Sequence, residues 1–173
     1  MKHRALAVTL LLLSPTSWLS AANNPNSDAA TAFSRLKSLA GDWEGKSPSG
    51  SKSHIRYEVI SGGSAVLEHF EDESLGPANA MVTVYYLDGG HLLLSHYCMA
   101  KNQPRMQAQA FDESTGELRF SFLDATGLDS PNAGHMHNAT FHFTDATHFS
   151  ADWQFFENGK PKLTESLQYT RVQ

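Results

Sequence analysis

The sequence has a single cysteine, Cys98, among its 173 residues. One cysteine excludes an intramolecular disulfide, so the packing of apolar side chains has to stabilise the fold. A lone cysteine in a globular domain is most often a small buried apolar side chain. A reactive thiol needs an activating group beside it.

Long apolar runs and basic clusters are also missing. The longest apolar run, Ala5–Leu13, is well short of the roughly 20 residues that span a bilayer, and no similar run follows. Acidic residues outnumber basic ones by 18 to 13, and the formal net charge is −5. This composition argues against nucleic acid and against anionic membrane surfaces as partners. We expect no membrane insertion once the N-terminal segment has been removed.

The N-terminal segment has the parts of a secretory signal peptide. Lys2 and Arg4 come first, the apolar run follows, and the small residues Ser20-Ala21-Ala22 offer a cleavage site. The predicted segments are a signal peptide (1–22), a disordered leader (23–27) and one domain (28–173). We predict a secreted protein, with the periplasm as the favoured location, and no lipid anchor because no cysteine lies near the cleavage region.

The hydrophobic pattern changes its period once along the chain. Between Ala29 and Ala40 apolar residues recur at spacings of three and four, which predicts a short helix capped by Ser27 or Asp28 and ended by Gly41. Beyond it the period is two, and turn residues recur about every ten to twelve positions. This pattern predicts about ten short antiparallel strands with no helices between them. We therefore predict an all-β fold, an antiparallel up-and-down β-barrel with one short N-terminal helix.

Gly41 and Trp43 open the first predicted strand, and Arg171 lies on the last one. A glycine two residues before a tryptophan lets the strand bend over the end of a barrel, where the indole can plug that end and an arginine can cover the ring. We predict that these three residues form a closed barrel floor. Functional residues should then gather at the other end, with the loops Glu71–Ala80 and Asp124–Gly134.

The helix, the Gly-Asp-Trp entry to the first strand, the antiparallel strands and the terminal Tyr169-Thr170-Arg171 resemble the calycin superfamily, which includes the lipocalins. The resemblance covers nearly all of the predicted domain. Within it, the segments LKSLAGDWEGK, YEVISGGSAVLEH and MVTVYYLDGGHLLLSHYCMAKNQPRM look like small secreted bacterial proteins of the uncharacterised DUF1579-like group. The resemblance implies a lipocalin-like barrel that holds a small apolar ligand, and it implies no established activity.

The richest polar segment follows Leu94. Side chains two apart on a strand point the same way, so His96 and Cys98 face the interior if Leu94 does. Arg105 begins the next strand, where it and His96 can hold an anionic or carbonyl-bearing ligand, with Cys98 as a wall or a weak nucleophile. In the alternative interpretation His96 is a hydrogen-bonded core histidine and Arg105 pairs with an acid such as Asp112 or Glu113.

Two carboxylates alternate with apolar residues on their strands. Glu68 and Glu165 each point inward in one register and towards solvent in the other. Because a buried carboxylate is costly unless it is paired, an inward one is a candidate functional group. Tyr57 belongs to a large set of aromatic residues that either line a cavity or fill the barrel.

His135 and His137 can present both imidazoles to one face of a strand. This geometry suits Zn²⁺ if His96 or His69 supplies a third ligand. Such a pair also arises by chance among several histidines, so the two are weak metal candidates, and we predict no cofactor.

Three functions are compatible with these patterns. The favoured one is a secreted lipocalin-like protein that binds a small, partly apolar molecule in its barrel. Its predicted ligand-binding residues are His96, Cys98, Arg105, Glu68, His137 and Tyr57. The first alternative is a small barrel enzyme, of hydrolase or isomerase type, that uses His96 with Glu68 or Cys98. The second is a structural or partner-binding domain with an exposed strand edge or apolar patch. No motif predicts an oligomeric state.

Overall fold

The computed structural model describes residues 25–173, which contain one α-helix and ten strands. The predicted signal peptide lies outside the described residues. The helix, α1 (Pro25–Lys37), starts within the segment predicted as a leader. Two short 3₁₀ turns, η1 (Ser61–Gly63) and η2 (Pro77–Asn79), lie in connections. The strands are β1 (Gly41–Lys46), β2 (Lys52–Ile60), β3 (Ala65–Asp72), β4 (Met81–Asp88), β5 (His91–Tyr97), β6 (Gln103–Asp112), β7 (Glu117–Thr126), β8 (His135–Phe143), β9 (His148–Glu157) and β10 (Lys160–Arg171).

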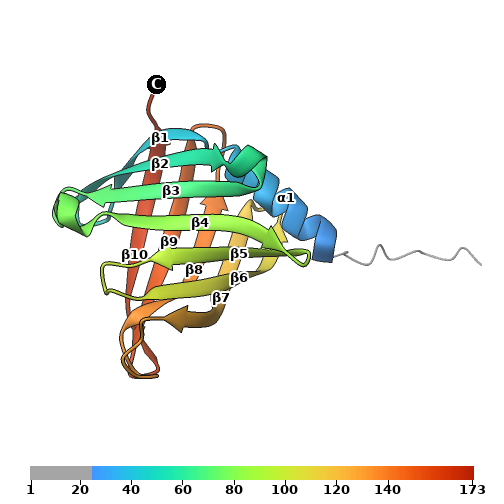
Figure 1. The fold of residues 1–173 in the computed structure, drawn as a ribbon. Coiled ribbons are helices and arrows are strands. Elements are labelled where there is room, and N and C mark those ends of the chain that lie inside the picture. The colour runs from blue at the N-terminus through green and yellow to red at the C-terminus, as the bar shows by residue number, and fades with distance from the viewer. Residues whose placement is uncertain (1–24) are drawn as a thin grey trace, which may run out of the picture.

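The strands form one closed antiparallel barrel (Figure 1). Each strand pairs with its neighbours along the chain, and β10 pairs with β1 to close the sheet. This confirms the predicted all-β, up-and-down antiparallel barrel with one N-terminal helix. Each of the ten described strands has a partner on both sides, so a partner-binding function that needs a free strand edge has no basis in them.

Alternation along the strands separates core from surface. In β2, Ser53, Ile55 and Tyr57 are buried and the residues between them are exposed, as expected for a strand with one inward face. Aromatic rings pack the interior near α1, where the ring centroid of Phe149 lies 4.8 Å from that of Trp43. This half of the barrel is therefore packed with side chains.

The predicted floor residues lie together at this end. Trp43 is fully buried, and the guanidinium carbon of Arg171, its partner across the β1–β10 pair, lies 4.1 Å from its ring centroid. The same guanidinium donates hydrogen bonds to the carbonyl oxygens of Ala40 (2.7 Å) and Ser38 (2.8 Å). Gly41 has a φ of 123°, and a β-carbon there would meet the guanidinium at 3.0 Å, so both backbone and space favour glycine.

Helix α1 lies against the floor end of the barrel (Figure 1). Its buried residues Ala32, Phe33 and Leu36 form one apolar face, and the helix contacts β4, β5 and β6. The indole nitrogen of Trp43 donates to the carbonyl oxygen of Leu39 at 2.7 Å, which ties the end of the helical segment to the barrel. Within residues 25–173, no helix is long and apolar enough to cross a bilayer.

The end opposite α1 is the mouth. It carries the connections that follow β1, β3, β5, β7 and β9. Both predicted mouth loops begin inside strands, because β3 continues to Asp72 and β7 continues to Thr126. Backbone pairing with β2 and β6 extends these strands beyond the end of the apolar alternation.

We expect Arg171→Met to lower the free energy of unfolding by roughly 2 kcal/mol, because it removes a cation–π contact and charge-assisted hydrogen bonds that join β10 to β1 and α1. Urea unfolding followed by tryptophan fluorescence measures the change. Arg119→Met is the control, since Arg119 is exposed and paired with Glu117 on the surface. Equal stability losses in the two variants would contradict the role of Arg171.

Candidate functional site

A cavity of about 520 Å³ opens at the mouth. Apolar side chains supply most of its wall, and a few hydroxyl and carboxylate groups lie at its edge. The connection after β3 contributes Ser74 and Leu75, as predicted for a mouth loop, whereas none of the lining residues comes from the connection after β7. The principal apolar lining residues are Phe70, Met81, Cys98, Met136, Phe155 and Leu163.

A recess of about 40 Å³ continues this cavity into the barrel. The two spaces share four lining residues, which are Phe70, Met81, Met136 and Glu165. Glu68, His96 and Trp153 line only the recess, so they mark its inner part. A volume of 40 Å³ is close to the ~30 Å³ that one water occupies in the liquid, so the recess accommodates one small polar group.

A row of polar side chains crosses four neighbouring strands at the recess. Tyr57 on β2 is the cross-strand partner of Glu68 on β3, which in turn is paired with Thr83 on β4, and Thr83 is paired with His96 on β5. All four are buried. Since paired residues on antiparallel strands point to the same face, the register alone brings these side chains together inside the barrel.

Glu68 accepts three hydrogen bonds in this row. The phenol oxygens of Tyr57 and Tyr85 lie 2.9 and 2.5 Å from its Oε2, and the hydroxyl of Thr83 lies 3.2 Å from its Oε1. Burial raises the pKa of Glu68, and the three hydrogen bonds oppose that shift by stabilising the carboxylate. Burial also raises the pKa of both phenols well above its usual value, and the charge of Glu68 adds to this, so they remain protonated donors.

His96 lines the recess, and one of its ring nitrogens has no hydrogen-bond partner. Its Nδ1 lies 2.9 Å from Oγ1 of Thr83. We assign the hydroxyl hydrogen of Thr83 to the carboxylate of Glu68, which makes Nδ1 the donor in the bond to Thr83 and leaves the lone pair on Nε2. That Nε2 is buried without a hydrogen-bond partner, and burial lowers the pKa of His96 to about 4, so the ring is neutral at neutral pH. The centroid of its ring lies 5.0 Å from that of Trp153.

The side chains that the enzyme hypothesis requires are not all in direct contact. Glu68 and His96 are joined through Thr83 and not directly. Cys98 lines the wall of the mouth cavity, and burial raises the pKa of its thiol. A thiol that stays protonated is a poor nucleophile, so Cys98 serves as an apolar wall in this arrangement.

Arg105 does not join this site, and its predicted grouping with His96 is wrong. It is paired across the strands with Ser95, the neighbour of His96, so the two side chains point to opposite faces of the sheet. On the outer surface its Nε lies 2.6 Å from Oδ1 of Asp124, and a second nitrogen contacts the other oxygen of the same carboxylate. The alternative interpretation, in which Arg105 pairs with an acid, is confirmed. The acid is Asp124 and not Asp112 or Glu113, because the β6–β7 register brings Asp124 beside Arg105.

His137 lies outside both cavities as well. A β-bulge between Met136 and Asn138 interrupts the alternation there. The imidazole stacks between the rings of Phe122 and Phe156, with centroid distances of 4.8 and 4.0 Å. His137 therefore belongs to an aromatic cluster and not to the wall of the mouth cavity.

The two histidines of the proposed metal pair bind each other. Nδ1 of His135 lies 2.8 Å from the carbonyl oxygen of Ala133, and its Nε2 lies 3.0 Å from Nδ1 of His137. His69 lies beside Glu71 on the exposed surface and His96 faces the recess, so neither joins the pair as a third ligand. Among residues 25–173, no group of three or more His, Cys, Asp or Glu side chains is placed to hold a metal ion.

Sequence reasoning missed Thr83 and Tyr85. In the sequence, Val82 and Val84 are the alternating apolar residues of this strand, but the buried residues of β4 are Met81, Thr83 and Tyr85. The signal that could have found them is the cross-strand position opposite Glu68, which requires the register of β3 and β4. Glu68 and Glu165 both take the inward register, since each lines the recess.

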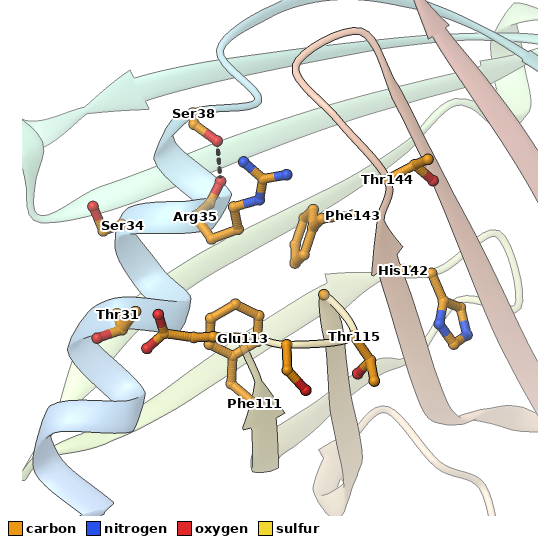
Figure 2. A pocket seen from close by; sticks show the side chains of 12 residues that line it. Thr31, Ser34, Arg35, Ser38, Phe111, Glu113, Thr115, His142, Phe143 and Thr144 are labelled. Atoms are coloured by element: carbon orange, nitrogen blue, oxygen red, sulfur yellow. Dashed lines mark hydrogen bonds between the residues drawn. The ribbon is translucent and has the colours of Figure 1, made fainter.

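A second hollow, of about 770 Å³, lies outside the barrel at the floor end. Figure 2 shows it between α1, the β6–β7 turn and the end of β8. Arg35 is the one cationic side chain that α1 contributes to the lining of this hollow. Its guanidinium carbon lies over the ring of Phe143, 5.1 Å from the ring centroid. None of the buried, unpartnered polar atoms in the described part of the chain lies in this hollow. The mouth cavity, which leads to such an atom, is the stronger candidate.

Comparison with known proteins yields only distant structural similarity. No protein-family model and no curated protein matches the chain. The structure of EF1p2_mFAP2b bound to DFHBI is 12% identical, with 84% of this chain and 98% of that chain covered and a TM-score of 0.33. A protein of unknown function from the DUF3598 family of Nostoc punctiforme is 9% identical, with 79% and 98% covered and a TM-score of 0.18. The barrel is therefore established by the strand order of this chain itself.

Replacing His96 should change how stability depends on pH. The native state keeps the ring neutral down to about pH 4, whereas the unfolded chain protonates it near 6.5, so the unfolded state binds more protons between these values. The stabilisation is full above pH 6.5 and is lost as the pH falls to about 4. Relative to His96→Gln, the free energy of unfolding of the wild type should rise by roughly 3 kcal/mol across this window, measured by urea unfolding at several pH values. Parallel profiles for the two proteins would contradict a buried neutral His96.

Proposed function

We propose that this protein is a lipocalin-like binding protein for a small, partly apolar molecule that enters the barrel through the mouth. The observation that carries the proposal is an apolar mouth cavity that shares four lining residues with a recess, and this recess is lined by His96, whose buried Nε2 has no hydrogen-bond partner. Buried polar atoms are nearly always hydrogen-bonded, so a ligand with a donor group would complete the hydrogen bonding of Nε2.

The shape of the barrel supports this proposal. The mouth cavity has about 520 Å³, within the ~300–1,000 Å³ typical of small-molecule sites. Leu75, Met99 and Leu163 line it and are 38%, 45% and 48% exposed, so an apolar rim surrounds the entrance. The packed floor under Trp43 closes the opposite end, which makes the barrel a container with one opening.

The ligand-binding residues of this proposal are a subset of those predicted from sequence, with additions. His96 and Glu68 line the recess, and Cys98 forms part of the wall of the mouth cavity. Tyr57 does not line either space but donates a hydrogen bond to Glu68. Thr83 and Tyr85 complete the polar network. The apolar body of the ligand would lie against Phe70, Met81, Met136, Phe155 and Trp153.

Binding of Nile red, a neutral apolar dye, tests the mouth cavity. We expect the dye to bind with micromolar affinity and to gain fluorescence as it leaves water. Met136→Trp should weaken this binding at least tenfold, because Met136 lines both the cavity and the recess and a larger side chain would fill their junction.

Leu87→Trp is the matched control, because it adds the same side chain at an exposed position of β4 that does not line the cavity. Its dye affinity should equal that of the wild type. Absence of dye binding to the wild type, or unchanged binding in Met136→Trp, would refute the proposed function.

We also propose that the protein works outside the cytoplasm, and that it belongs with the DUF1579-like secreted proteins that its sequence resembles. The support is the sequence of the N-terminal segment, with its basic start, apolar run and small-residue site. Expression of the full chain in a Gram-negative host, followed by mass spectrometry of the periplasmic fraction, should give a mature protein that begins at Asn23. An intact chain confined to the cytoplasm would contradict export.

A further inference from the structure

Among the Asp, Glu, Lys and Arg side chains that line the mouth cavity and the recess, all are acidic. Neither space has a lysine or arginine among its lining residues, whereas Asp72, Glu165 and Glu68 are all present. Arg105 lies on the outer face beside Asp124, and Lys162 is paired with Glu157. A carboxylate ligand would therefore enter a space lined only by acids and neutral groups.

Two of these acids influence each other. Hydrogen bonds from Ser74 and Ser51 lower the pKa of Asp72 in spite of its partial burial, so this carboxylate is ionised. Burial, together with the charge of Asp72, raises the pKa of Glu165. Both effects disfavour a negative charge at Glu165, and a cation bound beside it would favour that charge.

The polar groups of the recess also favour a ligand group that donates a hydrogen bond. Glu68 already accepts hydrogen bonds from Tyr57, Tyr85 and Thr83. The lone pair on Nε2 of His96 has no partner, although His96 is only 4% exposed. A ligand group that completes this site must therefore offer a hydrogen, and it must be small enough for a recess of about 40 Å³.

We propose that the ligand is an apolar primary amine whose ammonium group enters the recess, donates a hydrogen bond to Nε2 of His96 and neutralises Glu165. An ammonium group is compact and has three donors and no acceptor, which matches a recess whose free polar atoms accept. The apolar chain of the amine extends into the mouth cavity, along Phe70, Met81 and Met136. This inference rests on the proposed function, because it names the ligand class of the same cavity.

Three probes with the same apolar body and different head groups test the inference, namely octylamine, 1-octanol and sodium octanoate. Each is titrated against the Nile red complex of the full mature protein at neutral pH, and displacement gives its affinity. We expect octylamine to bind at least tenfold more tightly than octanol, and octanoate to bind more weakly than octanol. Octanoate or octanol binding as tightly as octylamine would overturn the inference.

Charge-neutralising variants locate the effect. Glu165→Gln should lower the affinity for octylamine at least tenfold and leave that for octanol within twofold. Glu71→Gln is the control, because Glu71 follows Phe70 on β3 but lies exposed beside His69 on the outer surface. An equal loss in both variants would show attraction by overall charge and would overturn the role of the recess.

The two proposals fail in different ways. If Nile red binds and Met136→Trp weakens it, but octylamine does not displace the dye, the cavity binds ligands and the amine inference is wrong. If Nile red itself does not bind, the proposed function fails before the head-group comparison.

Discussion

The buried carboxylate of Glu68 is the constraint on which the interior of this barrel depends. A buried carboxyl group is stable in an apolar core only when hydrogen-bonding partners surround it. Here the donors come from the strands on either side, with Tyr57 on β2 and both Thr83 and Tyr85 on β4. A shift of either strand by one residue would turn these donors outward and leave the carboxylate unpaired. The polar row thus specifies the register of the strands that form the end of the recess.

The two ends of the barrel have different compositions for a physical reason. Near α1 the interior holds large rings such as Trp43 and Phe149, which fill the space and contribute stability through burial. Towards the mouth the inward residues include flexible and polar side chains, such as Met81, Met136 and Glu165, and the space between them stays open. The same strands run through both halves of the closed sheet. Packing at the floor end therefore stabilises the strands that surround the open mouth.

The barrel and its floor could be predicted from sequence because both have local signals. Alternation of period two and regular turn residues indicate the strands, and the positions of Trp43 and Arg171 at the two ends of the strand series indicate the floor. Arg105 and Thr83 could not be placed in the same way. Alternation divides a strand into two faces without indicating which face points inward. Cross-strand neighbours depend on the register, and β-bulges such as the irregularity between Arg105 and Met106 shift that register.

The seam between β1 and β10 also bears on the order of folding. Arg171 binds the carbonyl oxygen of Ala40, 131 positions earlier in the chain. Every other strand pair joins consecutive strands, so hairpins can form one after another as the chain becomes available. The edges of β1 and β9, by contrast, remain without their last partner until the final strand is present. Closure is therefore the most non-local step, and a chain that lacks its last strand would expose two edges able to pair with other molecules.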